Sequence, residues 1–574
     1  MTSIMDAVAK TCAQLLAPGA PFELTECEIE GRRTKIYRNA FATLPELIDA
    51  GRAHGDKGFL VYQGERWSFT RFFADVDAIA TQLHAIGVKS GDRVAIAMRN
   101  RPEWAVAFAA AASLGAVPAP LNSFGLCGEL RAGFADVDPA VLFCDAERFE
   151  RIEGDSGVPG CRIVLVGAEP PPDAVGVLSY RTLAAQPPTA LPRPSLGPDD
   201  PALILFTSGA TSQAKGVLSS QRSVCQALFN IDFIGAISAM TSPQAVAAIM
   251  QRGFAPTTLT AVPLFHVSGL HAQLLLALRH GRRLVFMHRW DPVRALELIC
   301  DEQVTQFSGA PSMVMQLLAT RGFDDPQLTG SLGGLGFGGA GLPQPLIDEV
   351  FARRPDSMSG IGFGLTETNG VGAAASGELF RYKPRSSGLP SPIIDVHIAD
   401  ADGAPQPVGQ QGEIWLRGVT VMQGYWRNPD ASRQALVDGW FRTGDIGYVD
   451  DEGLLFVVDR IKDVINRSGE KIAAAEVESC LLEHPAVLEA AVFGVHDDQT
   501  GEAVAAAVVI DGGAGVTPEA LRAHVASRIA GYKVPAIVHV RSEPLPRNPA
   551  GKLLKSALKR EYPSADTTAS TGAE

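Results

Sequence analysis

The sequence lacks the cysteine patterns that mark disulfide frameworks and structural zinc sites. Its eight cysteines are scattered over 574 residues, with no Cys-x-x-Cys pair and no neighbouring cluster of histidines. Zinc sites need closely spaced ligands, and disulfide-rich chains are short and cysteine-dense. We therefore expect reduced and mostly buried thiols.

Long uninterrupted apolar runs are also absent. The most apolar long stretch, residues 104–121, is rich in alanine and contains Pro118 and Pro120, which is typical of a buried helix and strand. The N-terminal segment has Asp6 and Lys10 within its apolar part, unlike a secretory signal. The sequence therefore predicts no transmembrane segment, and the cytoplasm is the default location.

Positive charge is in deficit. Lys and Arg number 50 against 63 Asp and Glu, a net charge of -13. Proteins that bind nucleic acid over a large surface are basic. We therefore expect small-molecule partners and no nucleic acid, and any polyanion site must be locally basic.

The length indicates more than one domain, because 574 residues exceed what one hydrophobic core usually serves. From about residue 90, apolar strands alternate with helices, and the helix over 102–114 opens with proline. The other expected strands are 93–98, 141–144, 162–166, 284–287 and 304–307, and the other expected helices are 272–278 and 292–300. This alternation predicts an α/β fold with parallel sheets covered by helices on both faces.

The last part of the chain differs in composition. It becomes charged and glycine-containing over 453–471, and a short α+β segment follows. That segment is expected to contain a helix at 476–482, strands at 488–495 and 504–510, and a helix opened by Thr517 and Pro518. We predict a boundary near Arg460 and a disordered tail over 562–574.

An anion site is predicted where the apolar run before Thr207 stops in small hydroxyl and glycine residues and is followed by Lys215. Glycine lets the backbone approach an anion, hydroxyl and N–H groups donate hydrogen bonds, and lysine adds charge. Five residues separate Gly209 from Lys215, so this is not the ordinary P-loop. A nucleotide phosphate is the favoured ligand, and a polar turn after a buried strand is the alternative.

Three further segments, 338–341, 362–368 and 439–447, combine glycine with hydroxyl, aromatic or acidic residues, and each alone could be a turn. Together with the loop at Thr207 and with six other segments they form an ordered set. The six are 263–266, 412–414, 424–426, 459–463, 468–472 and 546–552. From about residue 41 to 555, this set resembles the adenylate-forming superfamily of acyl- and aryl-CoA synthetases, peptide-synthetase adenylation domains and beetle luciferases.

The resemblance implies a two-step reaction that uses ATP, Mg²⁺ and CoA. The carboxylate of an acid is joined to the α-phosphate of ATP with release of pyrophosphate, and a thiol then displaces AMP. It also implies an α/β fold: a large N-terminal domain (1–459) with parallel or mixed sheets and a small β-barrel-like part, a hinge (460–462) and a smaller mobile α+β domain (463–561).

Residue roles follow by resemblance only. Glu367 would hold Mg²⁺ together with Thr207, Thr366 would contact the α-phosphate, and Phe363 would stack on adenine. Asp445 would bind the ribose hydroxyls, with a turn-capping aspartate as its alternative. The implied ATP and AMP site comprises Thr207, Ser208, Gly209, Ala210, Thr211, Lys215, Gly339, Ala340, Gly362, Phe363, Gly364, Asp445 and Arg460.

The implied catalytic group for adenylation is Lys552, a flexible charge that can stabilise the transition state; its alternative is a solvated surface lysine. His266 would gate or line the acyl pocket, or be a core histidine. The small domain would turn about Lys462 between the two steps. The thiol step would then use Gly469, Glu470 and Lys471.

The expected substrate is an uncharged hydrophobic acid, such as a medium- or long-chain fatty acid, because no pocket aspartate for an amine is evident. The acyl pocket is assigned to Phe229, Phe233, Val267, Ser268, Gly269 and Gly338. The 235–256 segment is either a lid over this pocket or a surface helix and loop. Free CoA is the first choice of acceptor. A stand-alone enzyme that loads a carrier protein or an amine, a luciferase-like oxygenase and a non-catalytic nucleotide-binding protein are the alternatives. The number of subunits stays open, including a homodimer.

Overall fold

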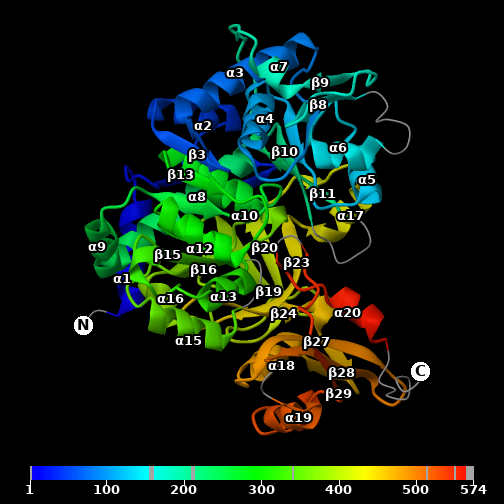
Figure 1. Cartoon of the computed structure of the whole chain (residues 1–574). Helices are drawn as coiled ribbons and strands as arrows, with labels where there is room; N and C mark the ends of the chain where they lie inside the picture. The colour runs from blue at the N-terminus through cyan, green and yellow to red at the C-terminus, as the bar shows by residue number, and fades with distance from the viewer. Residues whose placement is uncertain are drawn as a thin grey trace.

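A computed structural model describes residues 3–153, 161–207, 214–338, 342–511, 515–548 and 551–563. It is a mixed α/β protein with a large N-terminal domain and a smaller C-terminal domain, as predicted. Figure 1 shows the C-terminal domain, orange to red, below the blue, green and yellow layers of the large domain. The sheets account for most of the architecture, so we describe them first.

The largest sheet has nine strands in the order β18-β17-β16-β15-β14-β12-β13-β3-β4. Its strands are β18 (Leu389–Pro390), β17 (Ala373–Ser376), β16 (Gly360–Phe363), β15 (Gly334–Gly338), β14 (Gln306–Gly309), β12 (Thr257–Thr260), β13 (Arg283–Phe286), β3 (Gly58–Tyr62) and β4 (Glu65–Ser68). Pairing is parallel from β16 to β3 and antiparallel at both ends. The carboxyl ends of β12, β14, β15 and β16 therefore meet at one edge of the sheet.

A second sheet is parallel throughout, with the order β6-β5-β7-β8-β9. Its strands are β6 (Val117–Pro120), β5 (Arg93–Ala97), β7 (Val141–Asp145), β8 (Arg162–Val166) and β9 (Val177–Ser179). They match the predicted strands to within one or two residues where a strand was predicted. Their near-continuous apolar sequence is typical of strands buried on both faces.

Helices cover both parallel sheets. The large domain contains α1 (Ile4–Leu16), α2 (Leu44–Ala50), α3 (Phe69–Ala85), α4 (Pro102–Ser113), α5 (Cys127–Val137), α6 (Ala146–Glu153), α7 (Tyr180–Ala184), α8 (Gln221–Thr241), α9 (Pro243–Arg252), α10 (Val267–Gly269), α11 (Leu276–His280), α12 (Pro292–Asp301), α13 (Pro311–Ala319), α14 (Pro326–Thr329), α15 (Gln344–Arg353), α16 (Glu378–Tyr382) and α17 (Pro429–Ala435). Short 3₁₀ turns occur at Gly51–His54 and Thr366–Thr368. In Figure 1, α3 and α4 lie in the upper layer, whereas α12, α13 and α15 lie over the middle layer.

The predicted helix at 272–278 is confirmed as helical, but it is not α-helical throughout. Leu270–Leu275 forms a π-helical turn that leads into α11. A π-turn shifts the backbone hydrogen bonds by one residue and leaves the apolar pattern nearly unchanged. The sequence pattern therefore did not distinguish it from an α-helix.

Three smaller groups of antiparallel strands complete the described part of the large domain. The first is the pair of β1 (Leu24–Ile29) and β2 (Arg32–Tyr37), and the second consists of β10 (Pro201–Phe206), β11 (Gly216–Ser220) and β21 (Gly424–Tyr425). The third consists of β19 (Ile394–Ala399), β20 (Gly412–Gly418), β22 (Leu436–Val437), β23 (Trp440–Val449) and β24 (Leu455–Arg460). This third group is a five-stranded antiparallel sheet.

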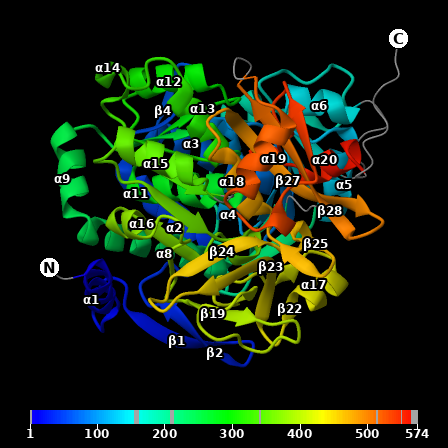
Figure 2. The ribbon, with the colours of Figure 1, turned by 90° about the horizontal axis from the view of Figure 1, so that it is seen from below.

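The C-terminal domain follows a 3₁₀ turn at Ile461–Asp463. Its sheet has the order β26-β25-β28-β27, with β29 parallel to β28. The elements are β25 (Ile465–Arg467), β26 (Glu470–Ile472), α18 (Ala474–Leu482), β27 (Val487–Asp497), β28 (Gly501–Ile510), α19 (Pro518–Ala526), a 3₁₀ turn (Gly531–Lys533), β29 (Ile537–Arg541) and α20 (Lys555–Glu561). Viewed from below, this domain lies in front of the large domain (Figure 2). Its helices α18 and α20 both pack against strand β27.

The predicted start of the disordered tail needs correction at Tyr562. Its ring stacks on that of His539 with centroids 3.7 Å apart, and its hydroxyl accepts a hydrogen bond of 2.8 Å from Arg541. Tyr562 is therefore part of the folded domain. The remainder of the tail, from residue 564, lies outside the described residues.

One helix in the described ranges, α8, is long and apolar enough to cross a membrane by length and composition. It packs against α1, α2 and strand β17 in the large domain, and 56% of its most apolar window is buried. These contacts are those of a core helix. The apolar stretch at 104–121 likewise forms α4 and β6.

Candidate functional site

The carboxyl ends of β15 and β16 border an open space. A Cβ atom built on Gly338 or on Gly362 would meet no other atom of the described residues within 4 Å. Phe363 follows at the end of β16 and is partly exposed. Gly339 and Ala340 were predicted to line the same site, but they lie outside the described residues. In open α/β sheets, ligands bind outside the carboxyl ends of strands, where this space is found.

The predicted phosphate loop connects β10 to β11. At its base, the Thr207 N–H donates to the Lys215 carbonyl at 2.9 Å, and the Lys215 N–H donates to the Thr207 hydroxyl at 3.3 Å. These bonds close the two ends of the loop against each other. Ser208, Gly209, Ala210 and Thr211 lie outside the described residues, so their predicted contacts are untested.

A tyrosine connects Lys215 with the predicted metal ligand. The Tyr425 hydroxyl donates to Glu367 Oε1 at 2.8 Å, and Lys215 Nζ lies 4.9 Å from the centre of the Tyr425 ring. Burial raises the pKa of Tyr425, so the phenol stays protonated and can donate. Tyr425 lies within the 424–426 motif, but the sequence alone indicates no role for it, because its partner Glu367 is distant in the chain.

Asp445 lies in β23 directly opposite Arg460 of β24. Arg460 Nε is 3.1 Å from Asp445 Oδ1, and Asp445 is 4% exposed. Burial raises the pKa of this carboxyl, and the charges of Arg460 and Lys552 counteract the rise. Asp445 is thus placed as an acceptor beside a cation, at the junction of the two domains.

Lys552 enters the same site from the C-terminal domain. Burial and the charge of Arg460 lower the pKa of its ammonium to about 8, although the charges of Asp445 and Glu367 act in the opposite direction. The charges of both carboxylates therefore act on Lys552. The turn that carries it touches the large domain, since a Cβ on Gly551 would lie 2.8 Å from the Ala310 Cβ.

His266 lies between β12 and α10 and faces Lys552. Burial and the charge of Lys552 lower the pKa of the imidazole to about 3, so the ring is neutral at physiological pH. Its Nε2 atom is buried and has no hydrogen-bond partner in the described part of the chain. An unpartnered buried nitrogen here is available to a ligand.

Behind the 3₁₀ turn of Thr366–Thr368, Asn369 adopts a left-handed conformation with φ of 53°. Its side-chain amide donates to the Thr420 carbonyl at 3.0 Å. This bond fixes the turn to the segment that connects β20 and β21. Burial lowers the pKa of His271, in the π-turn, to about 4, while a hydrogen-bonding effect of Asn369 opposes this change. Neither Asn369 nor His271 was predicted as a site residue.

The three predicted pocket residues after His266 differ in exposure. Val267 borders Gly370, because a Cβ on Gly370 would lie 3.1 Å from Val267 Cγ2, and Ser268 is exposed beside it. Gly269 is buried, and a Cβ there would lie 2.3 Å from the Pro263 carbonyl oxygen. Gly269 therefore has a packing reason to be glycine, whatever its relation to a substrate.

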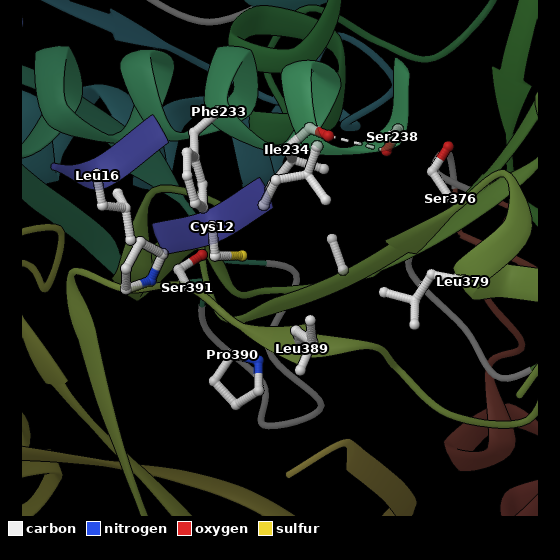
Figure 3. A pocket seen from close by; sticks show the side chains of 13 residues that line it. Cys12, Leu16, Phe233, Ile234, Ser238, Ser376, Leu379, Leu389, Pro390 and Ser391 are labelled. Atoms are coloured by element: carbon white, nitrogen blue, oxygen red, sulfur yellow. Dashed lines mark hydrogen bonds between the residues drawn. The ribbon is translucent and has the colours of Figure 1, made fainter. Parts of the chain in front are cut away.

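An apolar cavity of about 190 Å³ lies between α1, α8 and the β17–β18 edge of the large sheet. Figure 3 shows Cys12 and Leu16 from α1, Phe233 and Ile234 from α8, and Leu389 and Pro390 around it. Ser238, Ser376 and Ser391 are also among its lining residues, and no charged residue lines it. The predicted pocket residue Phe233 therefore does line a cavity.

Phe229 does not line this cavity. Its ring packs against Phe22 and Tyr37, with centroids 5.1 and 5.4 Å apart. It belongs to an aromatic cluster that fixes the N-terminal segment to α8. Over 235–256, α8 continues to Thr241 and places Ile237 and Ser238 in the cavity wall, whereas α9 has no buried residue. Residues Ile237 and Ser238 of that segment therefore form part of the wall of this cavity, and α9 is a surface helix.

The predicted thiol-step residues lie apart from this cluster. Gly469 lies in the exposed turn between β25 and β26, and Glu470 and Lys471 are exposed residues at the start of β26. The neighbouring backbone of Ser468 donates to the Thr500 carbonyl at 2.8 Å, within the C-terminal domain. In this orientation the cleft contains Lys552 and not this turn.

One further group of potential metal ligands lies in the described C-terminal domain. Atoms of Cys480, Glu483 and His524 are within 4.8 Å of one another. Glu483 also pairs with Arg528 at 3.5 Å, and a His524 ring nitrogen lies 3.0 Å from the Cys480 carbonyl oxygen. Sequence spacing gave no indication of this grouping, which arises because α18 packs on α19.

Comparison with known families agrees with this geometry. The AMP-binding enzyme model matches residues 48–426, and the model of the AMP-binding enzyme C-terminal domain matches residues 476–552. The chain belongs to the AMP-binding enzyme family. The resemblance to the adenylate-forming superfamily is therefore confirmed, and the chain is an enzyme of the AMP-forming acid–thiol ligase type. The two matched regions correspond to the large and small domains of the fold.

Similar proteins include several CoA ligases. The chain is 31% identical to the long-chain-fatty-acid–CoA ligase FadD13 of Mycobacterium tuberculosis, over 87% of this chain and 93% of that protein. It is 33% identical to the 2-succinylbenzoate–CoA ligase of Bacillus velezensis, over 89% and 96%. The solved structure of ATP-bound MatB from Rhodopseudomonas palustris is 26% identical and covers 90% of this chain and 99% of its own, with a TM-score of 0.77.

The geometry around Asp445 predicts the effect of removing its charge. Asp445→Asn should weaken AMP binding about tenfold or more, because a charged acceptor beside Arg460 is replaced by a neutral amide. Isothermal titration of the purified protein with AMP measures this affinity. Asp402→Asn, in an exposed turn of the large domain, is the matched control; equal affinities for the two variants would contradict a role of Asp445 in nucleotide binding.

Proposed function

We propose that this enzyme activates an apolar carboxylic acid with ATP, forming an acyl-adenylate and pyrophosphate, and then transfers the acyl group to CoA with release of AMP. The observation that carries the proposal is the approach of Lys552, from the C-terminal domain, to Asp445 and Glu367 of the large domain. A partly buried cation whose charge interacts with carboxylates, beside a loop suited to phosphate, fits a site for ATP and an acid.

In the first step, an oxygen of the substrate carboxylate attacks the α-phosphorus of ATP, and the bond to pyrophosphate breaks. Negative charge grows on the oxygens around the α-phosphorus. Lys552 supplies a positive charge that is already in place and poorly solvated, so it acts strongly on this developing charge. Lys215 and the loop that begins at Thr207 would contact the departing phosphates.

The residues present also suit Mg²⁺. The Glu367 carboxylate and the Thr207 hydroxyl are hard oxygen donors of the kind that Mg²⁺ prefers. Glu367 is 9% exposed, and the Tyr425 hydroxyl orients one of its oxygens at 2.8 Å. When bound, the ion would neutralise phosphate charge. Tyr425 and the Asn369 turn would hold Glu367 in position for it.

In the second step, the CoA sulfur attacks the acyl carbonyl and the bond to AMP breaks. We assign the large domain to residues 1–459, the hinge to 460–462 and the small domain to 463–562, with rotation about Lys462 between the steps. The exposed Gly469–Lys471 turn is available to enter the cleft after such a rotation. The present orientation, with Lys552 inside, corresponds to the first step.

The apolar cavity supports an apolar acid. Its lining of aliphatic, aromatic and serine side chains has no partner for a charged substituent, and burial of a hydrocarbon tail is favourable at ~25 cal/mol per Å². The cavity adjoins β17, which pairs with the site strand β16. A fatty or other hydrophobic acid is thus the favoured substrate class.

A screen of carboxylic acids for AMP release, with and without CoA, tests the function as a whole. AMP release that requires both an acid and CoA is expected. Release that requires an acid but continues with a carrier protein or an amine in place of CoA would favour a stand-alone adenylating enzyme. No AMP release with any acid would contradict the proposal.

Removal of the Lys552 charge separates the two steps. Lys552→Ala should slow acyl-AMP formation by about a hundredfold or more, the effect of losing one preorganised charge. Thioester formation from supplied acyl-AMP should be nearly unchanged, because Lys552 acts on the phosphate chemistry. Quenched-flow measurement of each half-reaction tests this, and equal losses in both would contradict the assignment.

The lowered pKa of Lys552 predicts a pH limit. Only the protonated ammonium stabilises phosphate charge, so kcat/KM for acyl-AMP formation should be level below pH 8 and fall as the pH rises through about 8. Lys552→Arg keeps a charge at all these pH values and should remove the decline, even if the rate is lower. A pH profile of wild type that stays flat to pH 10 would contradict the prediction.

Reducing the cavity volume should alter acid preference. Ile237→Trp would place a larger ring in the wall, so kcat/KM for long apolar acids should fall about tenfold while that for short acids and the KM for ATP stay unchanged. Met250→Trp, on exposed α9, is the matched control. An identical acid profile in both variants would show that the cavity does not accept the substrate.

A further inference from the structure

A buried lysine stands close to the catalytic turn. Lys555 is the first residue of α20, three positions after Lys552, and its side chain is only 14% exposed. Its Nζ lies 2.8 Å from Glu478 Oε1 of α18. Burial alone would lower the pKa of the Lys555 ammonium, but the charges of Glu478, Asp459 and Asp463 outweigh burial and raise it. Three acidic groups therefore surround one buried cation.

Glu478 connects three elements of the small domain. Besides pairing with Lys555 of α20, its Oε1 accepts a hydrogen bond of 2.8 Å from the Val492 N–H of β27. The Glu478 side chain is 16% exposed, and its partial burial raises its pKa. A buried carboxylate of this kind is stable as an ion only while its cation stays in place.

The opposite side of the catalytic turn is also held. Arg547 pairs with Glu489 of β27 at 2.8 Å, and it donates to the Gly551 carbonyl at 3.0 Å. The Lys552 N–H donates to Asn548 Oδ1 at 3.0 Å. All these groups lie after the hinge, so the turn moves with the small domain as one unit.

Asp459 contacts this unit from the other side of the hinge. It belongs to β24 of the large domain and is 9% exposed. Its Oδ2 accepts the Ala475 N–H at 3.2 Å, in the first turn of α18, where a negative charge is favoured by the helix dipole. Its other oxygen accepts the Arg460 N–H at 2.8 Å. Asp459 thus contacts α18 directly across the hinge, and its charge is one of those that raise the pKa of Lys555.

We propose that Asp459, Glu478 and Lys555 form an ionic latch that holds the small domain in the orientation in which Lys552 reaches the cleft. The three are positioning residues, and their proposed role rests on the two-step function proposed above. Rotation about 460–462 would leave the Lys555–Glu478 pair intact, since both residues lie after the hinge. It would separate Asp459 from Ala475 and Lys555, so the latch opens at Asp459.

The latch predicts an unequal effect on the two half-reactions. Asp459→Asn removes the charge but keeps an oxygen for the Ala475 N–H. Acyl-AMP formation should become about tenfold slower, within the usual range for coupling between two conformations. Thioester formation from supplied acyl-AMP should be unchanged or faster, because the orientation for the first step is less favoured. Rapid-quench measurement of each half-reaction gives both rates.

Variants at Lys555 and Glu478 provide a second test of the latch if Asp459→Asn does not fold. Lys555→Met leaves Glu478 unpaired, so the double variant Lys555→Met/Glu478→Met restores a neutral interior. It should reproduce the unequal effect of Asp459→Asn, and Lys555→Arg should largely retain wild-type rates. Arg560→Met, on the exposed side of α20, is the control and should change neither rate.

Two results would overturn the latch. Equal losses in both half-reactions would show a role in folding only, and unchanged rates in Asp459→Asn and in the double variant would show no role. Either result presupposes that wild type forms acyl-AMP. Failure of wild type to form acyl-AMP with any acid would instead contradict the proposed function, so the two failures are distinguishable.

Discussion

Burial of charge where the two domains meet is the constraint on which the rest of this structure depends. Lys552 is withdrawn from water to a position near Asp445 and Glu367, and its pKa falls to about 8. Such a cation is costly in an empty site and favourable beside phosphate. The same cost accounts for the fixed surroundings: the Tyr425 hydroxyl orients Glu367, and Arg460 orients Asp445 at 3.1 Å.

The large domain supplies the fixed half of this arrangement. Parallel pairing of β12, β14, β15 and β16 brings their carboxyl ends together, and glycines at 338 and 362 leave open space there. The small domain supplies the other half. Ion pairs of Arg547 and Lys555 within this domain hold the turn that carries Lys552. Under the proposed function, division of the charges between two domains would allow one chain to perform two successive reactions in one cleft.

Local patterns in the sequence predicted the elements, and they failed where contacts between distant segments decide. The strand at 141–144 was found as Val141–Asp145 because its apolar run admits no other interpretation. The π-turn at Leu270–Leu275 was missed because it preserves the apolar spacing. Tyr562 was assigned to the tail by its polar neighbours, yet it stacks on His539 of β29.

In the site, too, local motifs predicted some features, and contacts between distant segments decided the others. Family motifs located Asp445, Arg460 and Lys552, which the fold brings close together. The motifs did not show that Tyr425 bonds to Glu367. Nor did they show that Phe229 and Phe233 both pack on Phe22 and Tyr37 while only Phe233 of the two lines the cavity. Those distinctions depend on which distant segments pack against one helix face, and a helical period of 3.6 residues does not specify them.

The most direct test of the account is ATP–pyrophosphate exchange without CoA. If Lys552 and the carboxylates around it bring ATP and an acid together, labelled pyrophosphate should enter ATP only when a suitable apolar acid is present, and Lys552→Ala should abolish the exchange. Exchange without an acid, or CoA-dependent AMP release without any exchange, would contradict an acyl-adenylate formed in this cleft.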